Sequence, residues 1–151
     1  MRRSKGRGRP AGRWTLILLD TNVLIHVLKN NKAVVRRFEE RVGDMAIPAM
    51  VLGELLFGVA KSRNPTNNME LLKRLIDSLP VLHTNDAIMH AFATQKAALA
   101  ARGEIVDDAD LLIAATALAY DAPLATCNVR HFVRFTELRI EDWGAAKPSS
   151  S

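Results

Sequence analysis

Short apolar runs alternate along this chain with longer stretches in which apolar residues recur every three or four positions. The run "LILL" at residues 16–19 is typical of a buried strand, because it is short, apolar and bounded by polar residues. The following stretch, residues 21–30, has its apolar positions at the spacing of one helical face. A single carboxylate, Asp20, therefore lies where a strand ends and a helix begins.

The same alternation continues along the chain and indicates a mostly parallel sheet covered by helices on both faces. The predicted strands are residues 15–19, 45–47, 81–82, 123–125 and 138–140. The predicted helices are residues 20–30, 33–41, 49–61, 69–78, 86–102 and 108–121. The expected fold class is α/β, a three-layer α/β/α sandwich with a short, mostly parallel sheet.

The length and composition suit one folded domain with a tail at each end. A chain of 151 residues that is 48% hydrophobic can bury a core of its own. Residues 1–13 contain six basic side chains, no acid and too few apolar residues to fold alone. We expect a disordered basic tail over residues 1–13, a folded domain over 14–144 and a disordered C-terminal tail over 145–151.

The formal net charge of +5 describes the N-terminal tail rather than the predicted domain. Without the six basic residues of the tail, 15 of the 21 basic residues remain against 16 acidic ones, which is a net charge of −1. The tail can attract phosphate groups without sequence preference. One cysteine, Cys127, excludes an internal disulfide, and no apolar run reaches membrane-spanning length. We therefore expect a cytoplasmic protein that does not bind a membrane.

Two roles are open for Asp20. An Asp just before a helix commonly accepts hydrogen bonds from the first free amides of that helix. The carboxyl ends of strands in an α/β sheet are also the places where ligands bind. The residues around Asp20 favour the helix cap and leave the ligand site open.

Glu54 is a second acid in an unexpected place. It lies in the predicted helix 49–61, whose apolar stripe is formed by Leu52, Leu55, Leu56 and Val59. Glu54 points away from that stripe, yet its helical neighbours three or four positions away carry no charge. Either this carboxylate has a partner or a metal ion, or it is an exposed residue beside an apolar subunit interface. The helix alone does not decide between these interpretations.

Three further acids, Asp107, Asp108 and Asp110, crowd the start of a strongly apolar helix. One acid can cap the helix and a second gains from the helix dipole, but three exceed what capping requires. Carboxylates packed together repel each other unless protons or cations offset their charge. A hard divalent ion such as Mg²⁺ or Mn²⁺ takes carboxylate oxygens and keeps bound waters, so it suits such a set of acids.

Four segments of the chain occur in the order found in a known family: "LLDTNVLI", "PAMVLGELLFGV", "DADLLIAATALAYDAPLATCNVRHF" and "LRIEDW". They resemble the PIN-domain ribonucleases, in particular the VapC-like toxins of bacterial toxin–antitoxin pairs. The resemblance extends from about Leu16 to Trp143. It implies a PIN-like fold and an endoribonuclease that depends on Mg²⁺ or Mn²⁺.

The resemblance also implies which residues form the site. Asp20, Glu54 and Asp110 correspond to the core acids that hold the metal and catalyse, with Asp20 and Asp110 as direct ligands and Glu54 beside the attacking water. Asp108 ranks next among the catalytic candidates. The supporting polar positions are Thr21, Asn22, Thr126 and Asn128.

Two positions depart from the acid-rich form of this family. Asn128 is neutral where many PIN nucleases have a fourth acid, and His131 stands where an acid is common. A second metal ion loses an anchor as a result, so we expect one tightly held ion. A lone His is more often structural than a ligand, and His131 is therefore left out of the predicted site.

The resemblance implies three partners, namely an RNA substrate, a VapB-like antitoxin and a second copy of the chain in a homodimer. Met50, Val51 and Phe57 are expected to offer apolar surface to an antitoxin helix. The alternative function is a non-catalytic PIN-like module that binds nucleic acid or protein with its basic tail. The three acids argue against this alternative, and the neutral Asn128 favours it mildly.

Overall fold

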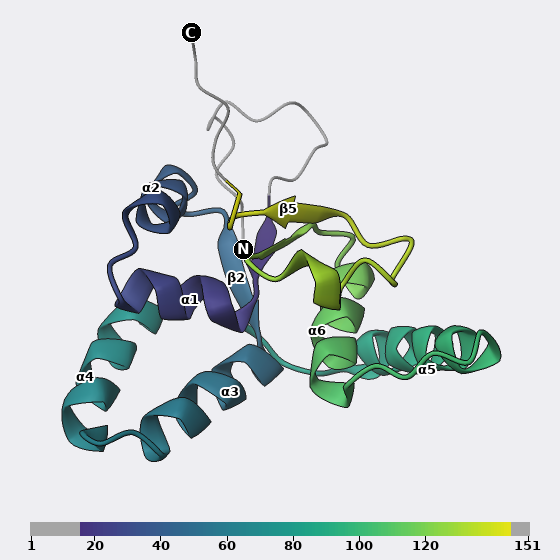
Figure 1. Ribbon diagram of the computed structural model, residues 1–151, viewed down its shortest axis with the longest axis horizontal. Coiled ribbons are helices and arrows are strands. Elements are labelled where there is room, and N and C mark those ends of the chain that lie inside the picture. Colours follow the sequence, from purple (N-terminus) through teal and green to yellow (C-terminus); the bar gives the residue numbers. More distant parts are fainter. Residues whose placement is uncertain (1–15, 146–151) are drawn as a thin grey trace, which may run out of the picture.

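A five-stranded parallel sheet forms the centre of the computed structural model, which describes residues 16–145 (Figure 1). The strands are β1 (Ile17–Leu19), β2 (Met45–Pro48), β3 (Val81–Leu82), β4 (Leu124–Thr126) and β5 (Ile140–Asp142), and their order in the sheet is β3-β2-β1-β4-β5. All four strand pairs are parallel, with Leu18 opposite Ala46 on one side and Leu124 on the other. The predicted basic tail, residues 1–13, lies outside the described residues, as do residues 146–151 of the predicted C-terminal tail.

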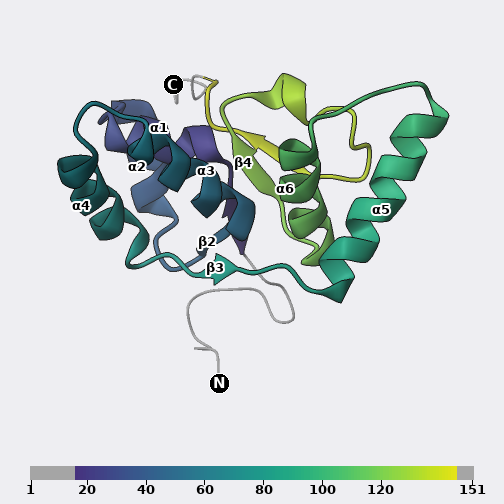
Figure 2. The same cartoon turned by 90° about the horizontal axis from the view of Figure 1, so that it is seen from below.

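The helices cover both faces of this sheet, which confirms the predicted three-layer α/β/α fold. They are α1 (Thr21–Leu28), α2 (Lys32–Glu40), α3 (Ala49–Ala60), α4 (Pro65–Ile76), α5 (Asp86–Ala101) and α6 (Asp108–Ala119), with a 3₁₀ turn η1 at Val129–His131. Figure 2 shows α1–α4 on one side of the strands and the pair α5 and α6 on the other. No helix within residues 16–145 is both long and apolar enough to cross a membrane.

The strand order reverses beside β1. The chain moves outward from β1 to β2 and β3, then returns to place β4 on the other side of β1. Parallel sheets bind ligands at such a reversal, outside the carboxyl ends of the two strands. Residues that follow β1 and end β4 are thus placed where a site is expected.

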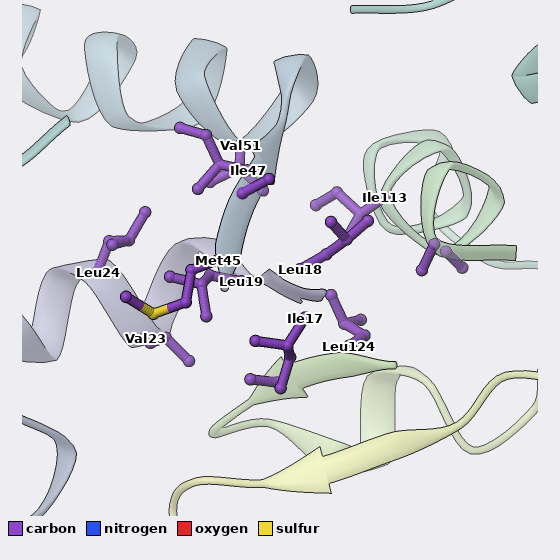
Figure 3. Packing of buried hydrophobic residues seen from close by; sticks show 14 of the residues in the cluster. Ile17, Leu18, Leu19, Val23, Leu24, Met45, Ile47, Val51, Ile113 and Leu124 are labelled. Carbon is purple, nitrogen blue, oxygen red and sulfur yellow. The ribbon is translucent and has the colours of Figure 1, made fainter. Parts of the chain in front are cut away.

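The hydrophobic core is built around β1, whose three residues are fully buried. Figure 3 shows these residues surrounded by apolar side chains of β2, β4, α1, α3 and α6. Trp143, Phe132 and Phe135 close the core near the C-terminal end, each with at most 2% of its surface exposed. The short apolar run "LILL" is uninterrupted because both faces of this central strand are covered.

Every predicted strand and helix is present, and two of them are displaced along the chain. Helix α4 begins at Pro65, four residues earlier than predicted, because the Asn64 side chain caps it and proline suits the first turn. Strand β5 lies over Ile140–Asp142 rather than residues 138–140, in register with β4. The buried Leu138 belongs to the loop that precedes the strand.

The predicted apolar stripe of α3 is partly wrong. The buried residues are Val51, Leu55 and Val59, which are four positions apart, whereas Leu56 is 38% exposed. Val51 is therefore a core residue. The expectation that it offers surface to an antitoxin helix is wrong. Phe57 is 64% exposed and can still contact a partner.

Candidate functional site

Asp20 lies directly after β1, at the point where the strand order reverses. Its Oδ1 accepts a hydrogen bond of 2.8 Å from the Thr21 backbone amide, so it does cap α1 as the sequence predicted. Its Oδ2 accepts a second bond of 2.7 Å from the hydroxyl of Thr126, the last residue of β4. The side chain thus connects the carboxyl ends of two neighbouring strands. Asp20 is buried, with only 5% of its surface exposed.

Thr126 connects Asp20 to the loop that follows β4. It is fully buried, and its Oγ1 also accepts a hydrogen bond of 2.9 Å from the Asn128 backbone amide. Asn22 makes a parallel connection, because its Oδ1 accepts a bond of 3.1 Å from the Cys127 backbone amide. The start of α1 and the end of β4 are consequently fixed relative to each other.

Glu54 reaches this region from α3. It is half-buried, and its Oε1 accepts a hydrogen bond from the Thr21 hydroxyl. Of the two interpretations that the sequence left open, the structure favours the one in which Glu54 has a polar partner. Thr21, the first residue of α1, thereby links this helix to Glu54 on α3.

Asp110 approaches from the first turn of α6. Its Oδ2 lies 3.1 Å from Nδ1 of His131, the last residue of the turn η1. The sequence gives no reason to include His131 in the site, but the structure places it beside Asp110. No spacing rule identifies this pair, because the two residues are brought together only by the packing of η1 beside α6.

The three carboxylates influence each other electrostatically. Burial is the main cause that raises the pKa of Asp20; hydrogen bonds from Thr126 and Thr21 oppose it, and the charges of Asp110 and Glu54 raise it further. Burial also raises the pKa of Asp110, His131 lowers it, and the neighbouring Asp107 and Glu54 raise it. The surroundings of Asp20 and Asp110 therefore disfavour the ionised form of both carboxyl groups.

The other acids at the start of α6 have different surroundings. Asp108 is exposed, and its Oδ1 lies 3.1 Å from Nζ of Lys96 on α5, so it is turned away from Asp110. Residues two positions apart on a helix point about 200° apart, which explains the divergence. Asp107 is the N-cap residue of α6 but makes no side-chain capping bond. Its charge acts on Asp110 instead and raises the pKa of that carboxyl group.

Asn128 contributes its backbone rather than its side chain. It precedes η1 as the N-cap residue and makes no side-chain capping bond there. Its backbone amide donates a hydrogen bond to Oγ1 of Thr126. Within residues 16–145, no three Asp, Glu, His or Cys side chains lie close enough together to hold one ion as they stand. Asp20, Glu54 and Asp110 are thus brought to one region of the fold, and each is held by a hydrogen-bond donor of its own.

Comparison with known proteins places this geometry in context. The sequence profile described as "PIN domain" matches residues 17–138. The tRNA(fMet)-specific endonuclease VapC of Shigella flexneri is 35% identical over 127 residues, which are 83% of this chain and 96% of that protein. Ribonuclease VapC2 of Haemophilus influenzae is 31% identical over 127 residues, with the same coverage of both chains.

A solved structure shows the same likeness in three dimensions. The crystal structure of DNA-bound VapBC from Salmonella typhimurium contains a chain that matches with a TM-score of 0.81 and 32% identity. The match covers 85% of this chain and 98% of that chain. The residues matched by the family profile, 17–138, include the positions of Asp20, Glu54, Asp110 and Thr126.

Proposed function

The chain belongs to the PIN-domain family, and we propose that it is a metal-dependent endoribonuclease, the cytoplasmic toxin of a VapBC-type toxin–antitoxin pair. The observation that carries this proposal is the convergence of Asp20, Glu54 and Asp110 at the reversal of strand order. The names of the relatives support the substrate class, because they are ribonucleases and a tRNA-specific endonuclease.

The donor set fits a hard divalent cation. Asp20, Glu54 and Asp110 offer carboxylate oxygens, with the hydroxyls of Thr21 and Thr126 beside them, and Mg²⁺ and Mn²⁺ prefer such oxygen ligands. Mg²⁺ keeps several of its waters and needs only one or two direct carboxylates, so three carboxylates in one inner shell are not required. We assign Asp20 and Asp110 as the residues that would hold the cation directly, and Glu54 as the acid that would act on the attacking water. Asp108, held by Lys96, stays a weaker candidate.

The residues of the pocket have separate roles in the proposed hydrolysis. A divalent cation held by Asp20 and Asp110 would offset their negative charge, lower the pKa of a coordinated water and stabilise negative charge on the phosphate. Glu54, held by the Thr21 hydroxyl, orients that water and accepts its proton. The water oxygen forms a bond to phosphorus while the bond to the 3′ oxygen breaks in line, and the 3′ oxygen takes up a proton from solvent, which leaves a 5′-phosphate and a 3′-hydroxyl.

A groove whose lining includes Glu54 is a candidate surface for the antitoxin partner. This groove of about 350 Å³ lies between α1, α3 and α4, and its apolar lining includes Ile25, Leu28, Leu55 and Leu71. Three of these side chains are more than a third exposed, at 39%, 38% and 42% for Ile25, Leu28 and Leu71. Such a groove suits the apolar face of a helix, and Glu54 at its edge suits a basic side chain. We propose that a VapB-like segment binds here and that the toxin pairs with a second copy elsewhere.

Cleavage of structured RNA by the purified chain tests the proposed activity. We expect cleavage with MgCl₂ or MnCl₂, none with EDTA, and none by the Asp20→Asn or Asp110→Asn variants. Deletion of residues 1–13 should preserve cleavage, because the pocket lies in the folded domain. RNA that is bound but left intact under all these conditions, with binding lost on deletion of the tail, would establish the alternative of a non-catalytic binding module.

A further inference from the structure

The contact between His131 and Asp110 is the feature of the pocket that the proposed reaction leaves without a role. The Nδ1 atom of His131 lies 3.1 Å from Oδ2 of Asp110. A carboxylate oxygen in this contact accepts, so Nδ1 carries the proton and donates it. Within the described chain, no hydrogen bond reaches the other oxygen of Asp110, Oδ1, so this donor alone orients the carboxylate.

Both ends of the contact are on rigid backbone. His131 ends the turn η1, where its amide donates to the Asn128 carbonyl at 3.1 Å and the next residue, Phe132, donates to the Val129 carbonyl at 2.9 Å. Phe132 is fully buried and anchors this turn in the core. Asp110 lies in the first turn of α6, and the Leu111 amide closes that turn on the Asp107 carbonyl at 2.9 Å.

A carboxylate held in this way has one orientation instead of many. The terminal torsion of an Asp side chain is broad, so its plane rotates freely unless a hydrogen bond fixes one oxygen. The charges of Asp107 and Glu54 repel the Asp110 carboxylate and raise its pKa, but they do not fix its orientation. The contact from His131 opposes rotation of the carboxylate plane and leaves Oδ1 as the oxygen available to a cation.

We propose that His131 is a positioning residue that orients Asp110 for a divalent cation through Nδ1. This inference rests on the proposed function, since it concerns the ion that the nuclease would use. Donors that orient metal-bound carboxylates typically change metal affinity by about 10-fold to 100-fold when they are removed. His131 itself then touches neither the cation nor the RNA.

Three substitutions separate this role from a general packing role. His131→Asn keeps a nitrogen donor the same number of bonds from the backbone as Nδ1, His131→Gln moves the donor one bond further, and His131→Ala removes it. His90→Ala is the matched control, because His90 is an exposed residue of α5. Thermal unfolding of each full-length variant establishes that it folds.

Calorimetric titration with MnCl₂ alone gives the main readout. We expect His131→Ala and His131→Gln to weaken Mn²⁺ binding by about 10-fold or more, His131→Asn to stay closer to the wild type, and His90→Ala to match it. At saturating Mn²⁺, the KM for RNA should be unchanged in all variants. In the metal-free protein, nitrogen NMR of the imidazole should show the proton on Nδ1.

Each contrary result has a distinct meaning. Equal Mn²⁺ affinity of wild type and folded His131→Ala overturns the positioning role alone, as does a proton found on Nε2 only. A raised KM with unchanged Mn²⁺ affinity also overturns it, because His131 would then contact RNA. A wild-type chain that neither binds Mn²⁺ nor cleaves RNA overturns the proposed function itself.

Discussion

Replacing Asp20 by Asn changes the charge of the pocket while preserving most of its geometry. Asn is as good a helix cap as Asp, so the bond from the Thr21 amide should persist. The new amide group faces the Thr126 hydroxyl, which then accepts instead of donating. Thr126 also accepts from Asn128, so its hydroxyl proton loses its partner, at a cost of about 1 kcal/mol.

The loss of charge acts in the opposite direction. Because the pKa of Asp20 is raised mainly by burial, with Asp110 and Glu54 adding to the effect, its ionised form destabilises the folded protein at neutral pH. Removing that carboxylate relieves the burial cost and the repulsion. Without metal, we expect the variant to be slightly more stable than the wild type.

The stabilisation by Mn²⁺ should differ much more between the wild type and Asp20→Asn. A ligand that binds only the folded state stabilises it by about 2.7 kcal/mol at a concentration 100 times its Kd. For a protein of this size, each kcal/mol shifts the melting temperature by roughly 2–4 °C. Saturating Mn²⁺ should thus raise the Tm of the wild type by about 5–10 °C and leave that of Asp20→Asn unchanged.

Thermal unfolding of both proteins in EDTA and in MnCl₂ measures this difference. Asp77→Asn is a suitable control, because Asp77 is an exposed carboxylate at the end of α4 and its loss should leave the Mn²⁺ response intact. RNA cleavage by the same samples should fall to background in Asp20→Asn only. An equal Mn²⁺ shift in wild type and Asp20→Asn, or full cleavage by the variant, would refute the assignment of Asp20.

Three further outcomes follow from the same contacts. Thr126→Val should lower the free energy of unfolding by about 1–3 kcal/mol in urea, since it leaves buried groups unpaired, and an unchanged value would contradict the role of this hydroxyl. Leu18→Ala should cost about 2–5 kcal/mol because Leu18 is fully buried in β1, whereas Val133→Ala, at an exposed position, should cost under about 0.5 kcal/mol. The pKa values of Asp20 and Asp110 are raised in the folded state, so without metal the stability should fall as the pH rises from the ordinary carboxyl pKa through the raised values. Urea unfolding across this pH range should show a weaker dependence in Asp20→Asn, and an equal dependence would contradict these shifts.

The sequence predicted the strands and helices well because their signals are local. The run "LILL" and the polar break at Asp20 place β1 and the start of α1 without knowledge of any other element. Boundaries that depend on pairing were less accurate. Strand β5 is positioned by its register with β4, and no local pattern encodes that register.

The acids of α6 show which part of a site the sequence can specify. In the sequence, Asp108 and Asp110 are equivalent members of one acidic cluster. Helical geometry directs them to different faces, so Asp108 pairs with Lys96 while Asp110 enters the pocket. His131 could not be assigned from the sequence, because its distance from Asp110 depends on how η1 packs beside α6.

The pocket is arranged so that the fold tolerates its acids before any cation binds. Asp20 has the Thr126 hydroxyl, Glu54 has the Thr21 hydroxyl, and Asp110 has the His131 imidazole. Two of these acids also lie at helix N-terminal ends, Asp20 at α1 and Asp110 at α6, where the helix dipole favours negative charge. These donors and dipoles offset part of the repulsion between the carboxylates. If the proposed cation binds here, removing any one of these donors should weaken its binding, which titration of each variant with MnCl₂ measures.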